Sequence, residues 1–347
     1  MASSGQRIRV TDIAAEAGVS VATVSKVLNG RLDVAPATRA RIEGMLIARQ
    51  YVPTKRTRRP SVRPASVRRG SLIEILFNDA GTPWAAEMIS GAEQAARGAG
   101  VGIVVSVLEG GPGGGRQWVG EVAGRGSRGV ILALSDLPAS DLKRIVKLGV
   151  PVVLVDPVGD LDADLPSIGA GNWGGGMAAT RHLLDLGHCR IGTITGPMRY
   201  LCSQARLAGY RAALERAGID PDPDLVQRGD FYHDSALRSA LRLLDLPEPP
   251  TAIVTGNDEQ ALGVYAAVRQ RGLRVPEDLS VVGFDDVPMA QWISPPLTTV
   301  HQPIRELAEL ATRAVLHATG GVAELTQGRV ELSTTLVVRG STAALSR

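Results

Sequence analysis

The spacing of apolar residues along the chain changes from helical to strand-like near residue 70. Between Val10 and Tyr51 apolar residues recur every three or four positions, which is typical of helices with one buried face. After Ser71, short apolar runs alternate with amphipathic segments. Buried strands that alternate with helices build parallel sheets, because each crossover between parallel strands takes a helix-length connection. The pattern therefore predicts an all-α head followed by a larger α/β body.

Three helices are predicted in the head. Thr11 is expected to cap the first helix, which ends near Gly18, and Ser20 is expected to cap the second. Pro36 is expected to begin the third helix. The side chains expected in the buried stripes of the second and third helices are Val21, Val24, Val27, Leu28, Ile42, Met45, Leu46 and Ala48. Two short helices joined by a tight turn, with a third packed behind them, form a helix-turn-helix.

Seven apolar runs in the body are expected to be strands. They are residues 72–77, 101–108, 129–134, 150–156, 189–195, 251–256 and 279–285. The amphipathic segments between them predict helices at 85–97, 175–186, 203–217 and 259–271. This is too many units for one compact sheet, so we expect two doubly wound parallel-sheet subdomains with a cleft between them.

Composition adds the broad class of protein. With 347 residues, 44% of them hydrophobic and 21% charged, the chain is expected to form ordinary globular domains. No apolar stretch is long enough to span a membrane, and the N-terminus lacks the apolar core of a signal peptide. The two cysteines, Cys189 and Cys202, are interpreted as reduced thiols. These features favour a cytoplasmic protein.

Charge is unevenly distributed between head and body. Residues 1–70 hold 14 Lys and Arg against 4 Asp and Glu, a formal charge of +10, whereas the remaining residues carry −7. Residues 54–70 alone contain seven Lys and Arg and no acid, with prolines at 60 and 64, which predicts a cationic linker. A basic head on an acidic body indicates an anionic partner, and a solvated basic tail is the alternative.

The helical pattern of the head favours DNA as that partner. In a helix-turn-helix the N-terminus of the second helix reaches base edges in the major groove, where Lys26 can donate to guanine and Val21 or Ala22 can contact a thymine methyl. Hydroxyl and amide side chains of the head can bond phosphates. The candidate DNA contacts in the head are Thr11, Ser20, Val21, Ala22, Thr23, Ser25, Lys26 and Asn29. A purely structural three-helix cap is the alternative, but it would not need a charge of +10.

Polar residues that follow the predicted strands suggest a ligand site in the cleft. Asp156 and Asp285 each end a strand, and an ionised carboxylate suits sugar hydroxyls. Asn257 follows another strand, and Arg206 lies early in a predicted helix. Trp84 and Ser135 follow two further strands and are weaker candidates, since Trp84 also fits a packing residue. Capping of the following turns is the alternative for the two aspartates.

Several motifs carry a resemblance to a known family. They are VTDIAAEAGVSVATVSKVLNG at 10–30, TRARIE at 38–43, YVP at 51–53, HLLDLGHCRIG at 182–192, RLAGY at 206–210, NDEQALG at 257–263, VPEDLSVVGFDD at 275–286 and PLTTVHQP at 296–303. With these motifs the chain resembles the lactose-repressor (LacI-type) family over nearly its whole length. The resemblance implies a periplasmic-binding-protein-like body, a homodimer and a small effector, usually a sugar, that alters operator affinity. It also implies that the positions of Asp156, Arg206, Phe231, Asn257 and Asp285 line the effector pocket.

The resemblance also suggests domain boundaries. We expect a DNA-binding head at 1–53, a basic linker at 54–70 and an effector-binding and dimerisation body at 71–347. The body is expected to divide into one subdomain at about 71–168 and 302–331, and a second at about 169–301 and 332–347.

The linker departs from the family pattern. Members of the family form a short hinge helix there and insert a leucine into the minor groove, but Pro60 takes the place of that leucine. A proline wedge or basic side chains in a narrow minor groove are one interpretation, and a flexible basic tether is the other. The linker residues expected to contact DNA are Lys55, Arg56, Arg58 and Arg59.

Nothing in the sequence indicates catalysis. The five histidines show no metal-binding spacing, and no G-x-S-x-G nucleophile motif is present, so we expect no catalytic residues, no metal and no cofactor. The sequence therefore predicts a homodimeric transcriptional regulator, most simply a repressor, that binds a palindromic operator and a small effector. The alternative is a cytoplasmic sugar-binding protein with a non-specific basic head. An enzyme with a doubly wound body is disfavoured because no catalytic constellation is present.

Overall fold

The structure is a computed structural model that describes residues 10–28, 34–48, 71–108, 113–159, 165–318 and 328–345. The chain divides into two compact units, Met1–Ser66 and Val67–Arg347. The first unit is the head and the second is the body, and each is described by itself.

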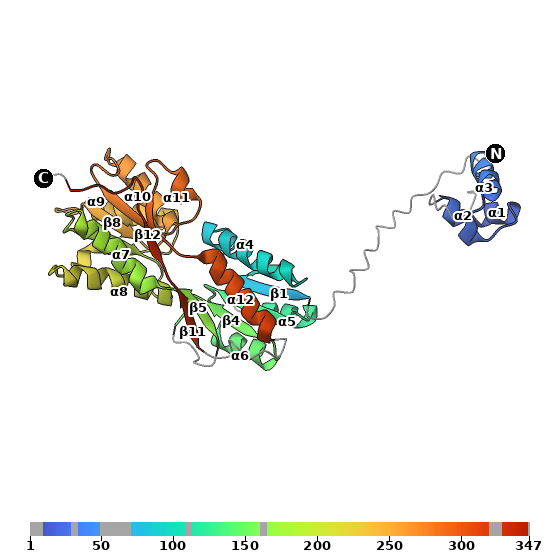
Figure 1. Cartoon of the computed structure of the whole chain (residues 1–347), viewed down its shortest axis with the longest axis horizontal. Coiled ribbons are helices and arrows are strands. Elements are labelled where there is room, and N and C mark those ends of the chain that lie inside the picture. Colours follow the sequence, from blue (N-terminus) through green and yellow to red (C-terminus); the bar gives the residue numbers. More distant parts are fainter. Residues whose placement is uncertain are drawn as a thin grey trace, which may run out of the picture. The chain divides into compact units, whose positions relative to one another are not determined.

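The head contains three helices, as predicted: α1 (Val10–Glu16), α2 (Val21–Leu28) and α3 (Pro36–Ala48) (Figure 1). The backbone N–H of Thr23 donates to the Ser20 Oγ at 3.2 Å, so Ser20 caps α2 as expected. The backbone at Gly18 has a φ of +60°, which lets the chain turn sharply between α1 and α2. A small core formed mainly by Ile13, Val24 and Ile42 holds the three helices together.

Three expectations for the head are wrong. Val21, expected in the buried stripe of α2, is 46% exposed, because it is the first residue of the helix and lies outside the small core. Thr11 lies inside α1 rather than before it, because the helix already includes Val10, and Thr11 therefore does not cap it. Ala48 is exposed because it is the last residue of α3, where the helix leaves the small core. The two other predicted positions in α3 beside Ile42 are half-buried.

The body is built on two six-stranded sheets. The first sheet has the order β11-β5-β4-β3-β1-β2, and all of its strand pairs are parallel. Its strands are β1 (Leu72–Phe77), β2 (Gly102–Val107), β3 (Gly129–Ala133), β4 (Val152–Val155), β5 (Ser167–Ala170) and β11 (Arg329–Leu332). The second sheet has the order β12-β10-β9-β8-β6-β7, and it is parallel except for the β10–β12 pair. Its strands are β6 (Ile191–Thr195), β7 (Val226–Arg228), β8 (Ala252–Thr255), β9 (Ser280–Asp285), β10 (Thr298–His301) and β12 (Thr335–Val337).

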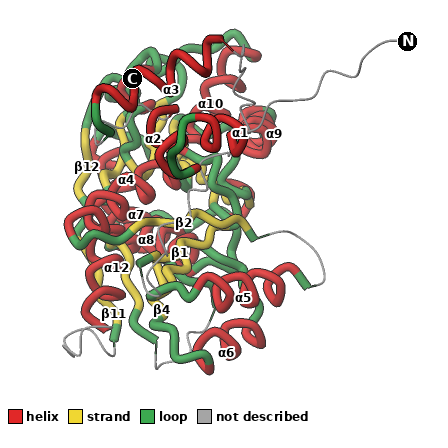
Figure 2. The backbone as a smooth tube through the Cα atoms, turned by 90° about the vertical axis from the view of Figure 1, so that its right-hand side faces the viewer, coloured by secondary structure: helices red, strands yellow, loops and turns green. Residues whose placement is uncertain are grey.

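Helices cover both faces of each sheet. The first sheet packs against α4 (Pro83–Gly98) and α12 (Ile304–Ala318) on one face and against α5 (Gly114–Arg125) and α6 (Ala139–Lys147) on the other. Figure 2 shows α5 and α6 side by side. The second sheet packs against α7 (Asn172–Asp185) and α8 (Leu201–Arg216) on one face. Its other face packs against α9 (His233–Leu244), α10 (Asp258–Gln270) and α11 (Met289–Trp292). Each sheet with its helices is one doubly wound α/β subdomain, and the two subdomains confirm the predicted fold class. We call the subdomain of the first sheet the first lobe and that of the second sheet the second lobe.

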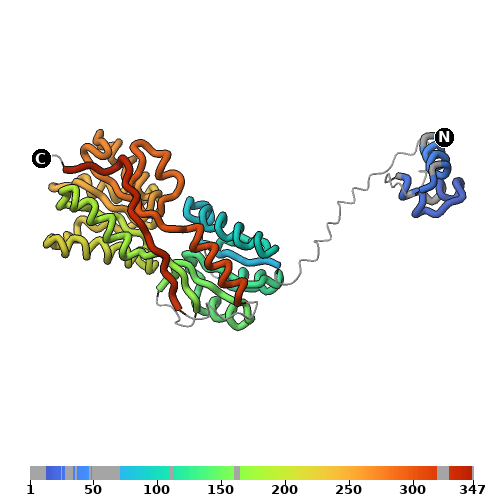
Figure 3. Tube along the Cα trace, in the orientation of Figure 1, coloured from blue at the N-terminus to red at the C-terminus, as the bar shows by residue number. Residues whose placement is uncertain are grey.

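The chain passes between the two lobes at three points in the part of the body that is described. It leaves the first sheet after β5, returns from β10 to α12, and crosses again between β11 and β12. Figure 3 shows the last of these crossings as the red C-terminal segment that runs from one lobe into the other. Each lobe is therefore made of discontinuous chain, so a change in the angle between the lobes must bend three neighbouring connections.

All seven predicted strands and all four predicted helices are present within a few residues of their expected bounds. Five strands were not predicted: β5, β7, β10, β11 and β12. They are short, three or four residues each, and several carry Gly, Thr or charged residues in place of an apolar run. Three of them, β7, β11 and β12, are edge strands, which need little apolar content because one side has no neighbour.

Candidate functional site

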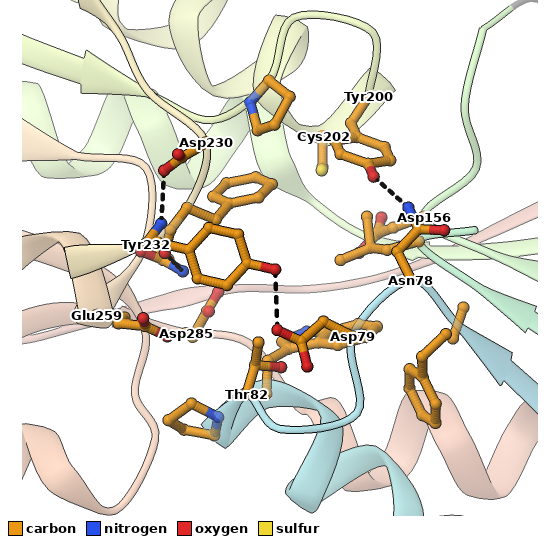
Figure 4. Close-up of a pocket in the computed structure, with 18 of the residues that line it drawn as sticks. Asn78, Asp79, Thr82, Asp156, Tyr200, Cys202, Asp230, Tyr232, Glu259 and Asp285 are labelled. Carbon is orange, nitrogen blue, oxygen red and sulfur yellow. Dashed lines mark hydrogen bonds between the residues drawn. The ribbon is translucent and has the colours of Figure 1, made fainter. Parts of the chain in front are cut away.

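A cavity lies between the two lobes, at the carboxyl ends of the strands. Including its open mouth it spans about 930 Å³, and its lining comes from both lobes. The first lobe contributes residues that follow β1, β3 and β4, and the second contributes residues from α8 and from the segments after β7, β8 and β9. In open α/β sheets this is where ligands bind. Figure 4 shows side chains from both lobes directed toward one another across this space.

The backbone at the ends of these strands takes an unusual conformation. Four residues that line the cavity have positive φ angles: Leu134 (46°), Asp156 (44°), Phe231 (78°) and Asp285 (111°). Non-glycine residues adopt such angles at a cost of the order of 1–3 kcal/mol each, and they concentrate at binding sites. The chain accepts this cost where it turns out of each strand, and the turns present these side chains at the cavity.

Arg206 is the central cation of the cavity floor. Its Nε donates to the Asn172 Oδ1 at 2.8 Å, and its Nη1 lies 3.5 Å from the Asp285 Oδ1 and also donates to the Gly256 carbonyl. The guanidinium lies over the Phe284 ring, 3.6 Å from the ring centroid, which adds a cation–π contact. Arg206 is 9% exposed, so these contacts hold it in one orientation at the cavity.

Three buried carboxyl groups lie near this arginine. Burial raises the pKa of Asp285 to about 7 against the opposing attraction of Arg206, and burial also raises the pKa of Asp156. Asp258 lies behind them, where burial and the charge of Asp285 raise its pKa well above the usual range. The Thr299 hydroxyl and the backbone N–H of Val287 donate to Asp258 at 2.5 and 2.9 Å. Burial therefore favours the protonated form of these carboxyl groups, whereas Arg206, together with Arg329 near Asp156, favours the ionised form.

A polar network joins the lobes on one side of the cavity, and we call Asn78, Asp136, Arg199 and Tyr200 the interlobe clasp. Arg199 donates to both carboxylate oxygens of Asp136 at 2.9 Å. The Asn78 Nδ2 donates to the Tyr200 Oη at 2.7 Å (Figure 4). It also donates to the Asp136 Oδ2 at 2.9 Å. Asn78 and Asp136 belong to the first lobe, and Arg199 and Tyr200 directly precede α8 in the second. On another side of the cavity the Tyr232 Oη donates to the Asp79 Oδ2 at 3.0 Å, which is a further bond between the lobes.

Aromatic rings supply the apolar part of the lining. Tyr200 and Phe231 stack with their ring centroids 6.1 Å apart, and Trp84 packs edge-on against Phe77 at 6.3 Å. Such surfaces suit the apolar face of a ring-shaped ligand. The Cys202 thiol also lines the cavity. It lies within α8, and burial raises the pKa of the thiol to about 12, so it contributes a neutral side chain.

Six of the seven residues predicted for the effector pocket line this cavity. They are Trp84, Asp156, Arg206, Phe231, Asn257 and Asp285. Ser135, the seventh, is not among the lining residues. Its Oγ accepts from the backbone N–H of Leu137 at 3.3 Å, which fixes the turn, and the next residue, Asp136, reaches the cavity instead.

Sequence reasoning missed several polar lining residues. Asn78 and Asp79 directly follow the first apolar run, so the rule used for Asp156 would have found them. Gln302 follows β10, a strand without an apolar run, and no sequence pattern marked it. The other missed residues are Thr82, Asp136, Arg199, Tyr200, Asp230, Tyr232 and Glu259.

In the head, the candidate DNA-reading residues occupy one end of α2. Val21 is 46% exposed, and Ala22 and Lys26 are also exposed, whereas Val24 and Val27 are buried in the core. Ser20 and Thr23 are held together by a 2.8 Å contact between their hydroxyls. Five candidate contacts, Asn29, Lys55, Arg56, Arg58 and Arg59, lie outside the described residues, as do the side chains of Thr11 and Ser25.

Comparison with known proteins identifies the family. Residues 9–54 match the bacterial regulatory proteins of the lacI family, and residues 180–342 match a periplasmic binding protein-like domain. The ribose operon repressor of Escherichia coli strain K12 is 33% identical over 332 residues, covering 95% of this chain and 98% of the relative. The chain belongs to the LacI family. It is therefore a DNA-binding transcriptional regulator, and the relatives it matches are regulators rather than enzymes.

Solved structures of the family extend over the same length. The transcriptional regulator CelR in complex with cellobiose superposes with a TM-score of 0.73 at 32% identity, covering 96% of this chain and 100% of the other. The lac repressor dimer bound to operator and the anti-inducer ONPF gives a TM-score of 0.70 at 28% identity, covering 98% and 100%. Within the described residues of this regulator, no helix is long and apolar enough to cross a membrane, and no cluster of His, Cys, Asp and Glu is arranged to hold a metal ion.

Proposed function

We propose that this regulator is a homodimeric repressor whose affinity for a palindromic operator is set by a small polyhydroxylated effector bound between its lobes. The observation that carries the proposal is the cavity lining. Carboxylates, a guanidinium and an amide converge there from both lobes, together with aromatic walls. Such a lining suits a sugar, because carboxylates accept from hydroxyls, Arg206 donates to them and a ring packs on the apolar face of the sugar.

The relatives support a sugar as the effector. One is named for the ribose operon, and the CelR structure was solved with cellobiose. Within the cavity we assign direct effector contacts to Asp156, Arg206, Asn257 and Asp285, with Phe231 and Trp84 as the aromatic walls.

We assign DNA recognition to the head. The exposed N-terminal end of α2 would enter the major groove, with Lys26, Val21 and Ala22 at base edges. Two heads on one dimer read two half-sites, which is why the operator is expected to be palindromic. We divide the chain into a head at 1–53, a basic linker at 54–70 and the body at 71–347, and we place the regulator in the cytoplasm with the DNA that it binds.

Closure of the lobes couples the two sites. An effector that contacts both lobes favours the arrangement in which both sets of contacts are made, and a change in lobe angle moves the start of β1, where the linker joins the body. Couplings of this kind are typically of the order of 1–3 kcal/mol, or a 5–150-fold change in affinity. Binding and conformational change account for this role, and we propose no catalytic step.

The first test is selection of bound DNA from a random pool by the purified full-length protein. An enriched palindrome is expected, and the selected operator is then titrated in the presence of pentoses, hexoses and disaccharides. At least one sugar should change operator affinity by more than about fivefold. A scrambled operator of equal length and composition is the control.

Two results would contradict the proposal. Binding that falls steeply with salt but shows no sequence preference would favour the alternative of a sugar-binding protein with a non-specific basic head. An enriched palindrome whose affinity responds to no sugar in the panel would leave the DNA-binding role standing and refute the sugar effector.

A further inference from the structure

The charges that line the cavity do not balance. Two guanidinium groups face six carboxyl groups, which are Asp79, Asp136, Asp156, Asp230, Glu259 and Asp285. Arg199 is paired with Asp136, and Arg206 lies beside Asp285. Because burial raises the pKa values of Asp156 and Asp285, these two add less negative charge than the other carboxyl groups. The remaining three, Asp79, Asp230 and Glu259, have no cation beside them in the described part of the chain.

We call Asp79, Asp230 and Glu259 the acidic rim. All three lie around Tyr232, and burial together with hydrogen bonding to Asp79 and the charges of the rim raises the pKa of the Tyr232 hydroxyl to about 12. None of the three carboxylates has a Lys, Arg or His side-chain nitrogen within 4.0 Å in the described part of the chain. His233 donates its backbone N–H to Glu259 at 3.4 Å, but its Nδ1 pairs with Asp234 at 2.9 Å.

The rim also keeps acceptor oxygens free. The Asp230 Oδ1 accepts from the backbone N–H of Tyr232 at 3.0 Å and from the Ser235 hydroxyl, whereas no donor among the described residues reaches its Oδ2. Glu259 likewise has a free oxygen, its Oε2, because only its Oε1 accepts a hydrogen bond from a described residue. These oxygens can accept from a ligand without breaking a bond inside the protein.

A second observation points to a donor-rich ligand in the same cavity. Gln302 is 1% exposed and lines the cavity, where its Nε2 donates to the Asp285 Oδ1 at 2.6 Å. Its Oε1 is buried and has no hydrogen-bond partner within the described residues. A buried acceptor without a donor costs about 1–3 kcal/mol, and a small shift of this side chain on ligand binding would let a donor of the ligand remove that cost.

We propose that the effector is a sugar that carries a protonated amine, with the ammonium group at the acidic rim. The proposal rests on the proposed function and deepens it by naming the class of sugar. Hydroxyl groups can satisfy the free acceptors, but only a cation also offsets the excess charge. A phosphorylated sugar is disfavoured, because its charge has the same sign as the rim.

Exposure limits the size of the effect. Asp230 is exposed, and Asp79 and Glu259 are half-buried, so water and salt screen the attraction. We expect the ammonium group to increase affinity about tenfold at low salt, with the advantage falling as salt is added.

The test is calorimetric titration of the full-length protein with matched pairs of sugars at about pH 6.5, where a primary amine is protonated. The pairs are D-glucose with D-glucosamine, D-galactose with D-galactosamine, and D-mannose with D-mannosamine. The N-acetylated form of each amine is a neutral control with a substituent at the same carbon. In at least one pair the amine is expected to bind about tenfold more tightly than both neutral forms.

Variants locate the ammonium group. The pair of substitutions Asp79→Asn and Glu259→Gln removes two rim charges at nearly constant shape, and the ratio of amine to neutral affinity should fall toward one. Glu215→Gln removes one exposed carboxylate of α8 that does not line the cavity, and it should leave the ratio unchanged. An unchanged ratio in the rim variant would overturn the proposal.

The outcomes separate this inference from the proposed function. If neutral sugars bind as tightly as the amines and also change operator affinity, the amine is refuted and the sugar effector stands. If no sugar of either kind binds, both are refuted. If putrescine, a diamine without hydroxyl groups, binds as tightly as the best amino sugar, the charge is recognised but the sugar is not, and the proposal fails.

Discussion

Asp285 combines three features that single residues rarely share. It is 5% exposed, its φ is 111°, and burial raises its pKa from an ordinary 3.8 to about 7. Its φ lies beyond the left-handed helical region in which aspartate is tolerated best, so the backbone at the end of β9 is strained. The raised pKa means that the folded chain holds a proton there over a range of pH in which the unfolded chain has lost it.

This proton makes stability depend on pH with a definite sign. A carboxyl group with a raised pKa in the folded state contributes stability that is complete below about pH 4 and is lost as pH rises through about 7. Asp285→Asn keeps the shape and removes the titration. The melting temperature of the wild-type body is therefore expected to fall, relative to that of the variant, between about pH 4 and pH 7, by roughly 2–4 °C for each kcal/mol. Thermal unfolding followed by circular dichroism at a series of pH values measures both melting temperatures. If the two melting temperatures change with pH in the same way, the prediction is contradicted.

Lys26 allows a prediction at the same scale for the head. If its ammonium group contacts a guanine edge, Lys26→Ala should lower operator affinity by about 1–3 kcal/mol and relax the preference at one base-pair position per half-site. Selection of DNA with wild type and variant reads this directly. Lys143→Ala, in α6 of the body, is the matched control. A uniform loss of affinity without relaxed preference would assign Lys26 to phosphate contact instead.

The position of a residue at the end of a strand could be predicted from the sequence wherever the strand itself could be predicted. Asp156, Asn257 and Asp285 follow long apolar runs, so their place at the carboxyl edge of a parallel sheet could be inferred from the sequence. Ser135 shows the limit of this inference, because the turn after β3 directs Asp136 rather than Ser135 to the cavity. A one-residue difference in a turn depends on backbone angles that no periodicity records.

Among the elements, α7 and α8 approach each other closely through glycines. A Cβ added to Gly209 would overlap the Trp173 carbonyl and lie 2.7 Å from the Met177 backbone nitrogen, and one added to Gly176 would overlap the backbone of Arg206. The same pair of helices carries Asn172 and Arg206, whose side chains are joined by a 2.8 Å hydrogen bond. The spacing of these helices thus sets the position of the central cation of the cavity.

Gly209→Ala should push the two helices apart. We expect a loss of stability of about 1–3 kcal/mol and a weaker effector response, because Arg206 moves with α8. Gly174→Ala is the matched control in α7, since nothing lies within 4 Å of a Cβ there, and alanine should be neutral or stabilising by up to about 1 kcal/mol. Chemical denaturation and effector titration of both variants test this. Equal stability of the two variants would show that the helices relax at no cost.

The elements that sequence analysis missed are those that tie the lobes together. β5 precedes one crossing, β10 precedes the next, and β11 and β12 flank the last. Their short segments are specified by pairing with long neighbours rather than by their own apolar content, since tertiary context decides strand formation at such positions. The local spacing of apolar residues therefore predicts the central strands and helices of each lobe well. It does not predict the strands next to the points where the chain crosses from one lobe to the other.

At the scale of the whole molecule, the two lobes are linked both by chain and by side chains. Three crossings bend together when the lobe angle changes, and the interlobe clasp adds hydrogen bonds between Asn78, Asp136, Arg199 and Tyr200. Arg199 and Asp136 are partly exposed, so their ion pair is weak on its own. If the bonds between the lobes are weak, the free-energy difference between two lobe arrangements is small. A small ligand that binds one arrangement more tightly can then shift the equilibrium between them.

Binding of the effector between the lobes and binding of the operator by the heads are expected to be thermodynamically linked. This linkage is the most demanding prediction for the whole regulator. If an effector changes operator affinity by some factor, the operator must change effector affinity by the same factor. We expect effector titrations with and without saturating operator to differ by about 5–150-fold in dissociation constant, equal to the factor measured from DNA binding. Calorimetry of the full-length dimer with the selected operator and with the scrambled control gives both numbers. Unequal factors would mean that the two titrations report different states, such as dimer and monomer, and would refute a simple exchange between two lobe arrangements.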